Sequence, residues 1–306
     1  MKKRLLVIAV LLMAAFVCIT VLNGMDTELS PSEPSGSGTA ATDTADIKPS
    51  SKGSPYKFYF ERLTPVEKRV YNAIIEKIYD MPERIAVPKI DGKELDNVFS
   101  ALLFDNPDLF FLGRKCAVET RMWLTYFSVD YIVDKADIAD MRERLDRECE
   151  AFEQTLTDPG NQWRTELEIH DHVIDRCEYH DPEGDLIYSS SYGALVDGRA
   201  ACEGYSKAVK LLLDRAGIEN ALISGVSENG EGSGGAHMWN IVNIGGDYYH
   251  LDCTWDDPVS DDGGKLRMYT YFNLSDEMIS GTHRDFSYDF VCNSTAENYY
   301  IKTGTY

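Results

Sequence analysis

Cys202 stands at the expected start of an amphipathic helix, where a thiol becomes chemically useful. Residues 201–217 place Tyr205, Val209 and Leu212 on one helical face and end in Gly217, the residue preferred just after a helix. Unpaired backbone N–H groups and the helix dipole favour a thiolate in the first turn. A thiolate is the nucleophile that acyl transfer needs, although a cysteine taken alone is more often a buried structural residue.

His237 and Asp252 lie on two expected strands, residues 237–244 and 247–255, which two glycines connect. A two-residue turn at Gly245-Gly246 would place Trp239 opposite Asp252 and His237 two residues away on the same face. The two side chains are therefore predicted to lie diagonally within reach of each other, and a one-residue shift would put them on opposite faces. Cys202, His237 and Asp252 then form a catalytic triad of nucleophile, base and orienting group.

A metal site is the alternative functional interpretation of this region. Its ligands would be Cys202, His237, His250 and Asp252, which lack the short ligand spacing typical of zinc sites. The seven cysteines also contain no CxxC pair. The sequence therefore predicts neither a metal nor a cofactor.

The segments ahead of Tyr192 are expected to support the site. Helices are predicted from Thr64 and from Asp91, because each opens a capping box with a glutamate three residues later. Further helices are expected over residues 136–156 and 163–178, and a strand over residues 122–127. The predicted fold class is α+β, with a helical subdomain at residues 56–160 and a catalytic domain at residues 161–306.

The first 23 residues have the pattern of a targeting segment. Three basic residues precede an apolar run at residues 5–22, which is about long enough to cross a bilayer. An uncleaved anchor, a cleaved signal peptide and lipidation at Cys18 remain the alternatives. Residues 24–55 are rich in Ser, Thr, Pro, Gly and Asp and are predicted to form a flexible stalk. We therefore expect an extracytoplasmic protein, either anchored or secreted.

The net charge of −21 bears on possible partners. Such a surface repels phosphates and anionic headgroups, so nucleic acid is not expected to bind. Contact with a membrane is expected only through residues 5–22, and the oligomeric state is not assigned.

Four motifs around these residues resemble the bacterial branch of the transglutaminase-like superfamily. They are Cys-Glu-Gly-Tyr at 202–205, Ala-Gly-Ile at 216–218, His-x-Trp-Asn at 237–240 and Asp-x-Thr-Trp-Asp-Asp-Pro at 252–258. The segment at 105–110 is also similar to surface proteins of Gram-positive bacteria, so the likeness extends over roughly residues 57–304. The resemblance implies a papain-like fold, in which a cysteine-bearing helix packs on an antiparallel sheet that carries the histidine and the aspartate.

The resemblance also implies thiol acyl chemistry on peptide or protein amides, with cell-surface or cell-wall proteins as expected partners. Cross-linking members of the family carry Gln before the cysteine and Trp after it, where this chain has Ala201 and Glu203. Hydrolysis of a peptidase or amidase type is therefore expected. The alternatives are a protein cross-linking transglutaminase and a non-catalytic surface binding module on the same fold.

The resemblance does not assign the group that stabilises the oxyanion. The backbone N–H of Cys202 is the default donor. Trp239, Tyr192 and Tyr205 are weaker candidates for contacting the oxyanion or the substrate.

Overall fold

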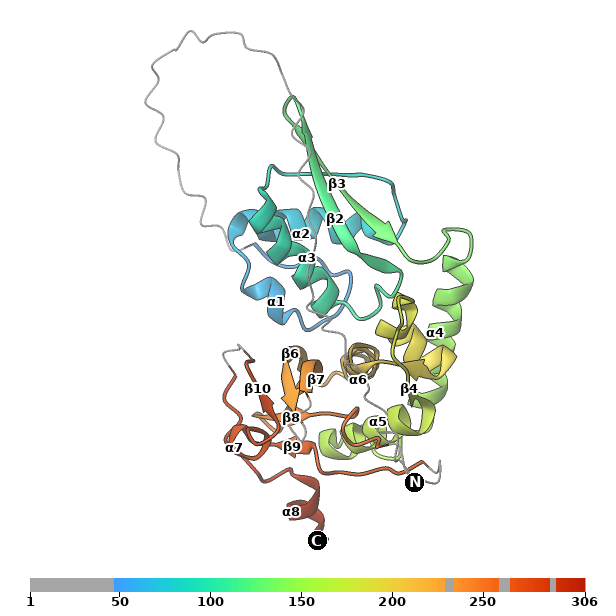
Figure 1. Cartoon of the computed structure of the whole chain (residues 1–306), viewed down its shortest axis with the longest axis vertical. Coiled ribbons are helices and arrows are strands. Elements are labelled where there is room, and N and C mark those ends of the chain that lie inside the picture. The colour runs from blue at the N-terminus through green and yellow to red at the C-terminus, as the bar shows by residue number, and fades with distance from the viewer. Residues whose placement is uncertain (1–46, 229–233, 259–264, 287–289, 306) are drawn as a thin grey trace, which may run out of the picture.

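The computed structural model describes residues 47–228, 234–258, 265–286 and 290–305. Its N-terminal part joins helices to a small antiparallel sheet with the strand order β1-β3-β2 (Figure 1). The elements of this part are α1 (Phe58–Glu61), α2 (Pro65–Ile78), β1 (Ile85–Val87), α3 (Gly92–Asp105), β2 (Leu112–Arg121), β3 (Leu124–Tyr131) and α4 (Ile138–Glu153).

The starts of α2 and α3 confirm the two predicted capping boxes. The side chain of Thr64 accepts from the backbone N–H of Glu67, and the Glu67 carboxylate accepts from the backbone N–H of Thr64. Asp91 and Glu94 make the same pair of bonds at the start of α3. Both helices thus begin where local hydrogen bonds satisfy N–H groups that have no partner within the helix.

The strand predicted over residues 122–127 is wrong at its first two residues. Met122 and Trp123 form the two-residue turn between β2 and β3, since Arg121 pairs with Leu124. Met122 has φ +54°, and the Met122 and Trp123 side chains are more than three-quarters exposed. Apolar residues resemble a strand in sequence, but here they turn the chain at the end of a hairpin that extends from the molecule (Figure 1).

The C-terminal part is built on a five-stranded antiparallel sheet with the order β10-β6-β7-β8-β9. Helix α6 packs against β6 and β7. The helices of this part are α5 (Gln162–Arg176), α6 (Cys202–Arg215), α7 (Asp276–Ile279) and α8 (Tyr299–Thr303), with a 3₁₀ turn at Leu186–Ser189 and a π turn at Gly193–Asp197. The strands are β4 (Glu178–Tyr179), β5 (Arg199–Ala200), β6 (Asn220–Glu228), β7 (Gly234–Ile244), β8 (Asp247–Leu251), β9 (Phe272–Leu274) and β10 (His283–Arg284).

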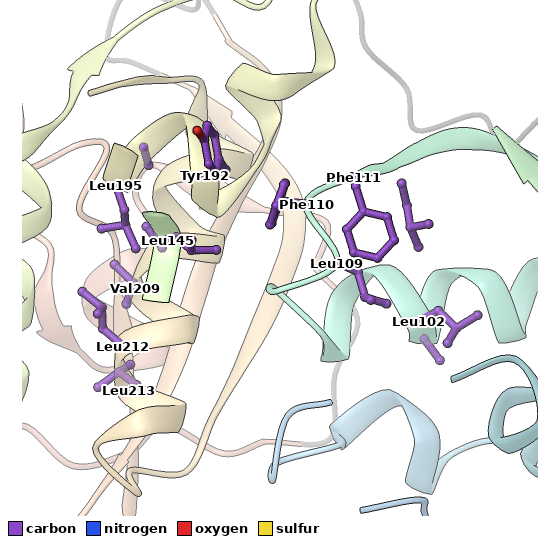
Figure 2. Close-up of a cluster of buried hydrophobic side chains, with 14 of the residues drawn as sticks. Leu102, Leu109, Phe110, Phe111, Leu145, Tyr192, Leu195, Val209, Leu212 and Leu213 are labelled. Carbon is purple, nitrogen blue, oxygen red and sulfur yellow. The ribbon is translucent and has the colours of Figure 1, made fainter. Parts of the chain in front are cut away.

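One cluster of buried side chains runs through both parts of the molecule, from Phe60 to Phe272. Figure 2 shows Phe110, which follows α3, on the side of the cluster that faces Tyr192 of the C-terminal part. The ring of Phe110 lies 5.0 Å from that of Tyr192. Tyr192, a weaker site candidate, is thus a core residue that helps to join the two parts.

The predicted stalk is described only from residue 47 onward, and there the chain already contacts the folded body. The backbone N–H of Ser50 donates to Asn72 Oδ1 at 2.9 Å, and that of Ser54 donates to Asn106 Oδ1 at 3.2 Å. Folded contacts therefore begin before the predicted boundary at residue 55. The predicted targeting segment, residues 1–23, lies outside the described residues. Among those that are described, no helix is long and apolar enough to cross a membrane.

Candidate active site

Cys202 is the first residue of α6, as the sequence predicts, and it is partly exposed. The other five described cysteines are buried. Gly204 allows this helix start to approach the preceding loop, because a Cβ there would lie 2.8 Å from the Tyr188 carbonyl oxygen. The first turn of α6 therefore presents one accessible thiol.

Two hydrogen bonds fix the start of α6 against β7. Ser206 Oγ donates to the Met238 carbonyl oxygen at 2.8 Å, and Asn240 Nδ2 donates to the Ser206 carbonyl oxygen at 3.0 Å. Both bonds are buried, where a lost partner is costly. They hold the helix tip next to His237, the neighbour of Met238.

The β7–β8 hairpin has the predicted register. Gly245 and Gly246 form the turn with φ of +65° and +99°, values that favour glycine, and Asn240 pairs with Leu251. Strand β8 ends at Leu251, however, so the prediction that it continues to residue 255 is wrong.

Asp252 lies at the point where the chain leaves the sheet. Its Oδ1 accepts from the backbone N–H groups of Thr254 and Trp255, at 3.0 and 3.2 Å. Its Oδ2 accepts from His237 Nε2–H at 2.6 Å, and both side chains are buried. The turn after β8, rather than a continued strand, thus aims the carboxylate at the histidine.

His237 and Asp252 shift each other's pKa values so that both stay charged. Burial by itself would lower the pKa of His237, but the Asp252 carboxylate and the adjacent Cys202 thiol raise it to about 10. Burial would raise the pKa of Asp252, but His237 and His283 together hold it well below its usual range. An imidazolium beside an ionised carboxylate is therefore the favoured state at neutral pH.

His283 is a site residue that the sequence did not reveal. Its Nε2–H donates to Asp252 Oδ2 at 2.9 Å, and its side chain is fully buried. It reaches the site because β10 forms the edge of the sheet and pairs with β6, with His283 opposite Ser227. A two-residue strand leaves no periodic pattern, so only an isolated histidine was visible in the sequence.

Tyr179 is a second residue that the sequence did not single out. Its strand β4 pairs in parallel with β5, with Tyr179 beside Ala200, two residues before the thiol. Burial, followed by the nearby Cys202 and Asp181, raises the pKa of Tyr179 to about 12, while half of its side chain stays exposed. A neutral hydroxyl thus lies at the solvent side of the site.

Trp239 and Tyr205 are held by partners within the protein. The Trp239 indole N–H donates to His250 Nδ1 at 2.9 Å, and its ring stacks on His237 with centroids 5.8 Å apart. The Tyr205 hydroxyl donates to Asp257 Oδ2 at 2.7 Å. The polar atoms of both side chains are already hydrogen-bonded within the protein. Trp239 and Tyr205 therefore pack around the site and do not offer a free donor to the oxyanion.

Two groups of side chains in the described residues have the composition of metal ligands. They are His237, Asp252 and His283, and His250, Asp276 and Cys292. In the second group His250 Nδ1 accepts from Trp239, so a neutral ring carries its proton on Nε2, which lies 3.0 Å from Asp276 Oδ1. With Nδ1 accepting a hydrogen bond and Nε2 protonated, the His250 ring has no free nitrogen lone pair to bind a metal ion.

A comparison with protein families finds a match over the central part of the chain. Residues 150–253 match the family model described as the transglutaminase-like superfamily. No curated protein matches the chain.

Three solved structures resemble parts of the chain. One is described as a TGase, with 14% identity and a TM-score of 0.32 over 56% of this chain and 50% of that one. A candidate cysteine protease from Cytophaga hutchinsonii has 15% identity and a TM-score of 0.30, over 47% of this chain and 56% of its own. A candidate protease from Parabacteroides distasonis has 17% identity and a TM-score of 0.29, over 52% and 34%. The chain thus spans between 34% and 56% of the length of these structures.

The family model ends one residue after Asp252, so it includes the three residues singled out in the sequence but not His283. The cysteine-bearing helix packed on an antiparallel sheet is the arrangement of the papain-like fold. Within this chain, residues 150–253 are therefore similar to the transglutaminase-like superfamily.

Proposed function

We propose that this chain is a thiol-dependent acyl-transfer enzyme that hydrolyses peptide or protein amides. One observation carries the proposal: an accessible thiol at a helix start lies beside His237, whose other ring nitrogen is bonded to the buried Asp252. Nucleophile, base and orienting group are thus in contact in the order that covalent catalysis requires.

The reaction proceeds in two balanced steps. The Cys202 sulfur attacks the amide carbonyl carbon, the C–N bond breaks, and His237 Nδ1–H gives its proton to the departing amine. Water then attacks the thioester, His237 accepts a proton from that water, and the carboxylic acid leaves as the C–S bond breaks. Asp252 stays ionised throughout and holds the imidazole through Nε2.

The oxyanion of each tetrahedral intermediate needs donors near the sulfur. We propose the backbone N–H of Cys202 and the hydroxyl of Tyr179, since β4 places this tyrosine next to the chain that enters α6. Its raised pKa keeps the hydroxyl protonated, and therefore able to donate, across the neutral range.

The surroundings of Cys202 favour water over an amine as acyl acceptor. Cross-linking relatives carry Trp after the cysteine, whereas Glu203 here pairs with Lys207 at 2.8 Å and with Arg114 of β2. Glu203 thus connects α6 to the N-terminal part. No aromatic side chain stands at this position to contact an incoming amine. We propose peptides and proteins outside the cytoplasm as substrates, with residues 5–22 as the membrane anchor.

Labelling of the thiol tests the proposal without a known substrate. Iodoacetamide is applied between pH 5 and 9, and modification is followed for each cysteine-containing peptide by mass spectrometry. We expect Cys202 to react at pH 6 at least about tenfold faster than free cysteine, and His237→Ala to remove this advantage. Cys202 reacting like free cysteine at every pH would contradict the proposal.

A second assay distinguishes hydrolysis from cross-linking. Labelled casein is incubated with the wild-type protein, with Cys202→Ala and with the control Cys149→Ala, which changes a buried cysteine of α4. Free peptides formed by the wild type and the control, but not by Cys202→Ala, support hydrolysis. Covalent incorporation of an added fluorescent primary amine, without peptide release, would instead identify a cross-linking transglutaminase.

A further inference from the structure

Two histidines from different strands share one oxygen of Asp252. His237 Nε2 lies 2.6 Å from Oδ2, and His283 Nε2 lies 2.9 Å from the same atom. We propose that His283 is a positioning residue of the reaction: it fixes Asp252 in its ionised form and so orients His237 toward Cys202. The inference rests on the proposed function and adds to the triad a fourth residue, beyond the segment that the family model matches.

The bond from His283 completes the hydrogen bonding of a fully buried carboxylate. Oδ1 already has the backbone N–H groups of Thr254 and Trp255, and Oδ2 has both imidazoles. A carboxylate with four donors keeps its charge in a buried site, whereas one that loses a donor gains proton affinity. His283 thus makes it harder for Asp252 to take the proton from His237.

The other ring nitrogen of His283 also has a hydrogen-bond partner. His283 Nδ1 lies 2.8 Å from the Thr282 hydroxyl. The same hydroxyl donates to the Ile279 carbonyl oxygen at 3.3 Å. The proton on Nε2 is instead required by Asp252, because an ionised carboxylate oxygen can only accept.

The ring of His283 is fixed by aromatic neighbours on three elements. Its centroid lies 4.9 Å from the rings of Trp239 and Trp255 and 5.5 Å from that of Tyr271. These contacts exclude water and leave the imidazole little freedom to rotate. The bond to Asp252 is therefore built into the core of the site.

Several titratable groups act on Asp252 or His283 from the surrounding elements. From β7, β8, the turn after β8 and the segment before β9 they are His237, His250, Cys253, Asp256 and Tyr271. Of the titratable groups among the described residues, only His237 and His283 are hydrogen-bonded to the side chain of Asp252. Loss of the His283 donor therefore acts on Asp252 directly, and the other groups remain as a constant background.

The distances favour hydrogen bonds over a metal ion held by the same three residues. Ligands at about 2.0–2.1 Å from a tetrahedral zinc lie about 3.3 Å apart. The observed nitrogen-to-oxygen separations of 2.6 and 2.9 Å are those of charge-assisted hydrogen bonds.

The test compares His283→Ala, His283→Gln and the control His172→Ala, whose ring stacks on Phe152 and has no contact with Asp252. Alkylation of Cys202 is measured between pH 5 and 9, alongside thermal unfolding. In His283→Ala we expect alkylation at pH 6.5 to fall about tenfold and the acid limb of the rate profile to move up by about one pH unit. His283→Gln should restore most of the rate because its amide N–H can donate to Oδ2. The control and added EDTA should leave the profile unchanged.

The outcomes distinguish this inference from the proposed function. If wild-type Cys202 reacts like free cysteine, the proposed function fails. If wild-type Cys202 is reactive and folded His283→Ala gives the same profile, only the role of His283 is overturned, as it also is if EDTA alters the profile. Should His283→Ala not fold, ¹⁵N NMR of the wild type decides: the inference requires a proton on His283 Nε2, and a ring protonated only on Nδ1 would refute it.

Discussion

At the scale of single residues, the site depends on how Asp252 is held. The chain turns directly after β8, and the two N–H groups of that turn bind Oδ1. Oδ2 is then free to face the histidines. Orientation of the base therefore comes from backbone geometry as much as from the identity of the side chain.

Asp252→Asn tests this orientation. The amide keeps an oxygen for the turn, but its NH₂ group would face His237 Nε2–H, so the imidazole must change tautomer or rotate away. We expect Cys202 alkylation at pH 7 to fall by a factor of about 10² or more, with thermal stability changed little. The exposed Asp285→Asn serves as control. An unchanged rate in folded Asp252→Asn would refute the triad.

Tyr179→Phe tests the proposed oxyanion donor. Alkylation involves no oxyanion, so its rate should stay at the wild-type value. Hydrolysis of casein should fall by about 10–100-fold, because a hydroxyl that stabilises the intermediate is lost. The matched control is Tyr300→Phe on α8. Equal casein hydrolysis by Tyr179→Phe and wild type would exclude Tyr179 from this role.

At the scale of elements, a buried acid joins α5 to the sheet. Glu166 Oε2 accepts from Asn273 Nδ2 at 2.8 Å, and Glu166 is fully buried. Burial raises its pKa to about 8. Glu166 Oε1 and Asn273 Oδ1 are both buried without a partner among the described residues. A protonated Glu166 fits these surroundings better than a carboxylate.

Glu166→Gln should change how stability depends on pH. The folded state holds the Glu166 proton more tightly than the unfolded chain, whose usual pKa is 4.5, so this stabilisation is complete below 4.5 and is lost as pH rises through about 8. Gln stays neutral at every pH and still accepts from Asn273. We expect similar melting temperatures for variant and wild type at pH 5, and a variant several degrees higher at pH 9. Glu150→Gln, at an exposed position of α4, controls for the loss of one charge. A variant less stable than wild type at pH 9 would show that Glu166 is ionised in the fold.

At the scale of the whole molecule, the N-terminal part and the sheet with its helices are expected to unfold as one cooperative unit. They share the continuous core, and the Tyr59 hydroxyl donates to the Leu222 carbonyl oxygen of β6 at 2.7 Å. Lys210 of α6 is almost fully buried and is bonded to Ser54 Oγ, the Tyr56 carbonyl oxygen and Asp214. The N-terminal part thus buries the outer side of the cysteine-bearing helix.

Phe110→Ala tests this cooperation. The side chain lies between the two parts, so its removal should lower the free energy of unfolding by about 3–5 kcal/mol. The change in fluorescence reports mainly on Trp163, Trp239 and Trp255, because the fourth tryptophan, Trp123, is already exposed in the folded protein. This change and proteolysis within α2 and α3 should show the same shifted denaturation midpoint. Met122→Ser, at an exposed turn, should have almost no effect. Loss of the N-terminal part alone in Phe110→Ala would mean that the two parts unfold independently.

The sequence by itself determined the features that depend on local interactions. The capping boxes of α2 and α3, the start of α6 at Cys202 and the register of the β7–β8 hairpin involve residues close along the chain. Their hydrogen bonds and periodicity are visible in short segments. For that reason His237 and Asp252 were predicted on one face from the two-residue turn alone.

Only the tertiary structure decided which distant residues complete the site. His283 arrives on a two-residue strand paired with β6, and Tyr179 on one paired with β5. Neither strand has a repeating pattern, and each pairing closes a loop of many residues whose entropy cost only the assembled core offsets. The exposed Met122-Trp123 turn and the end of β8 at Leu251 were likewise hidden, because apolar composition indicates a strand but not where packing ends it.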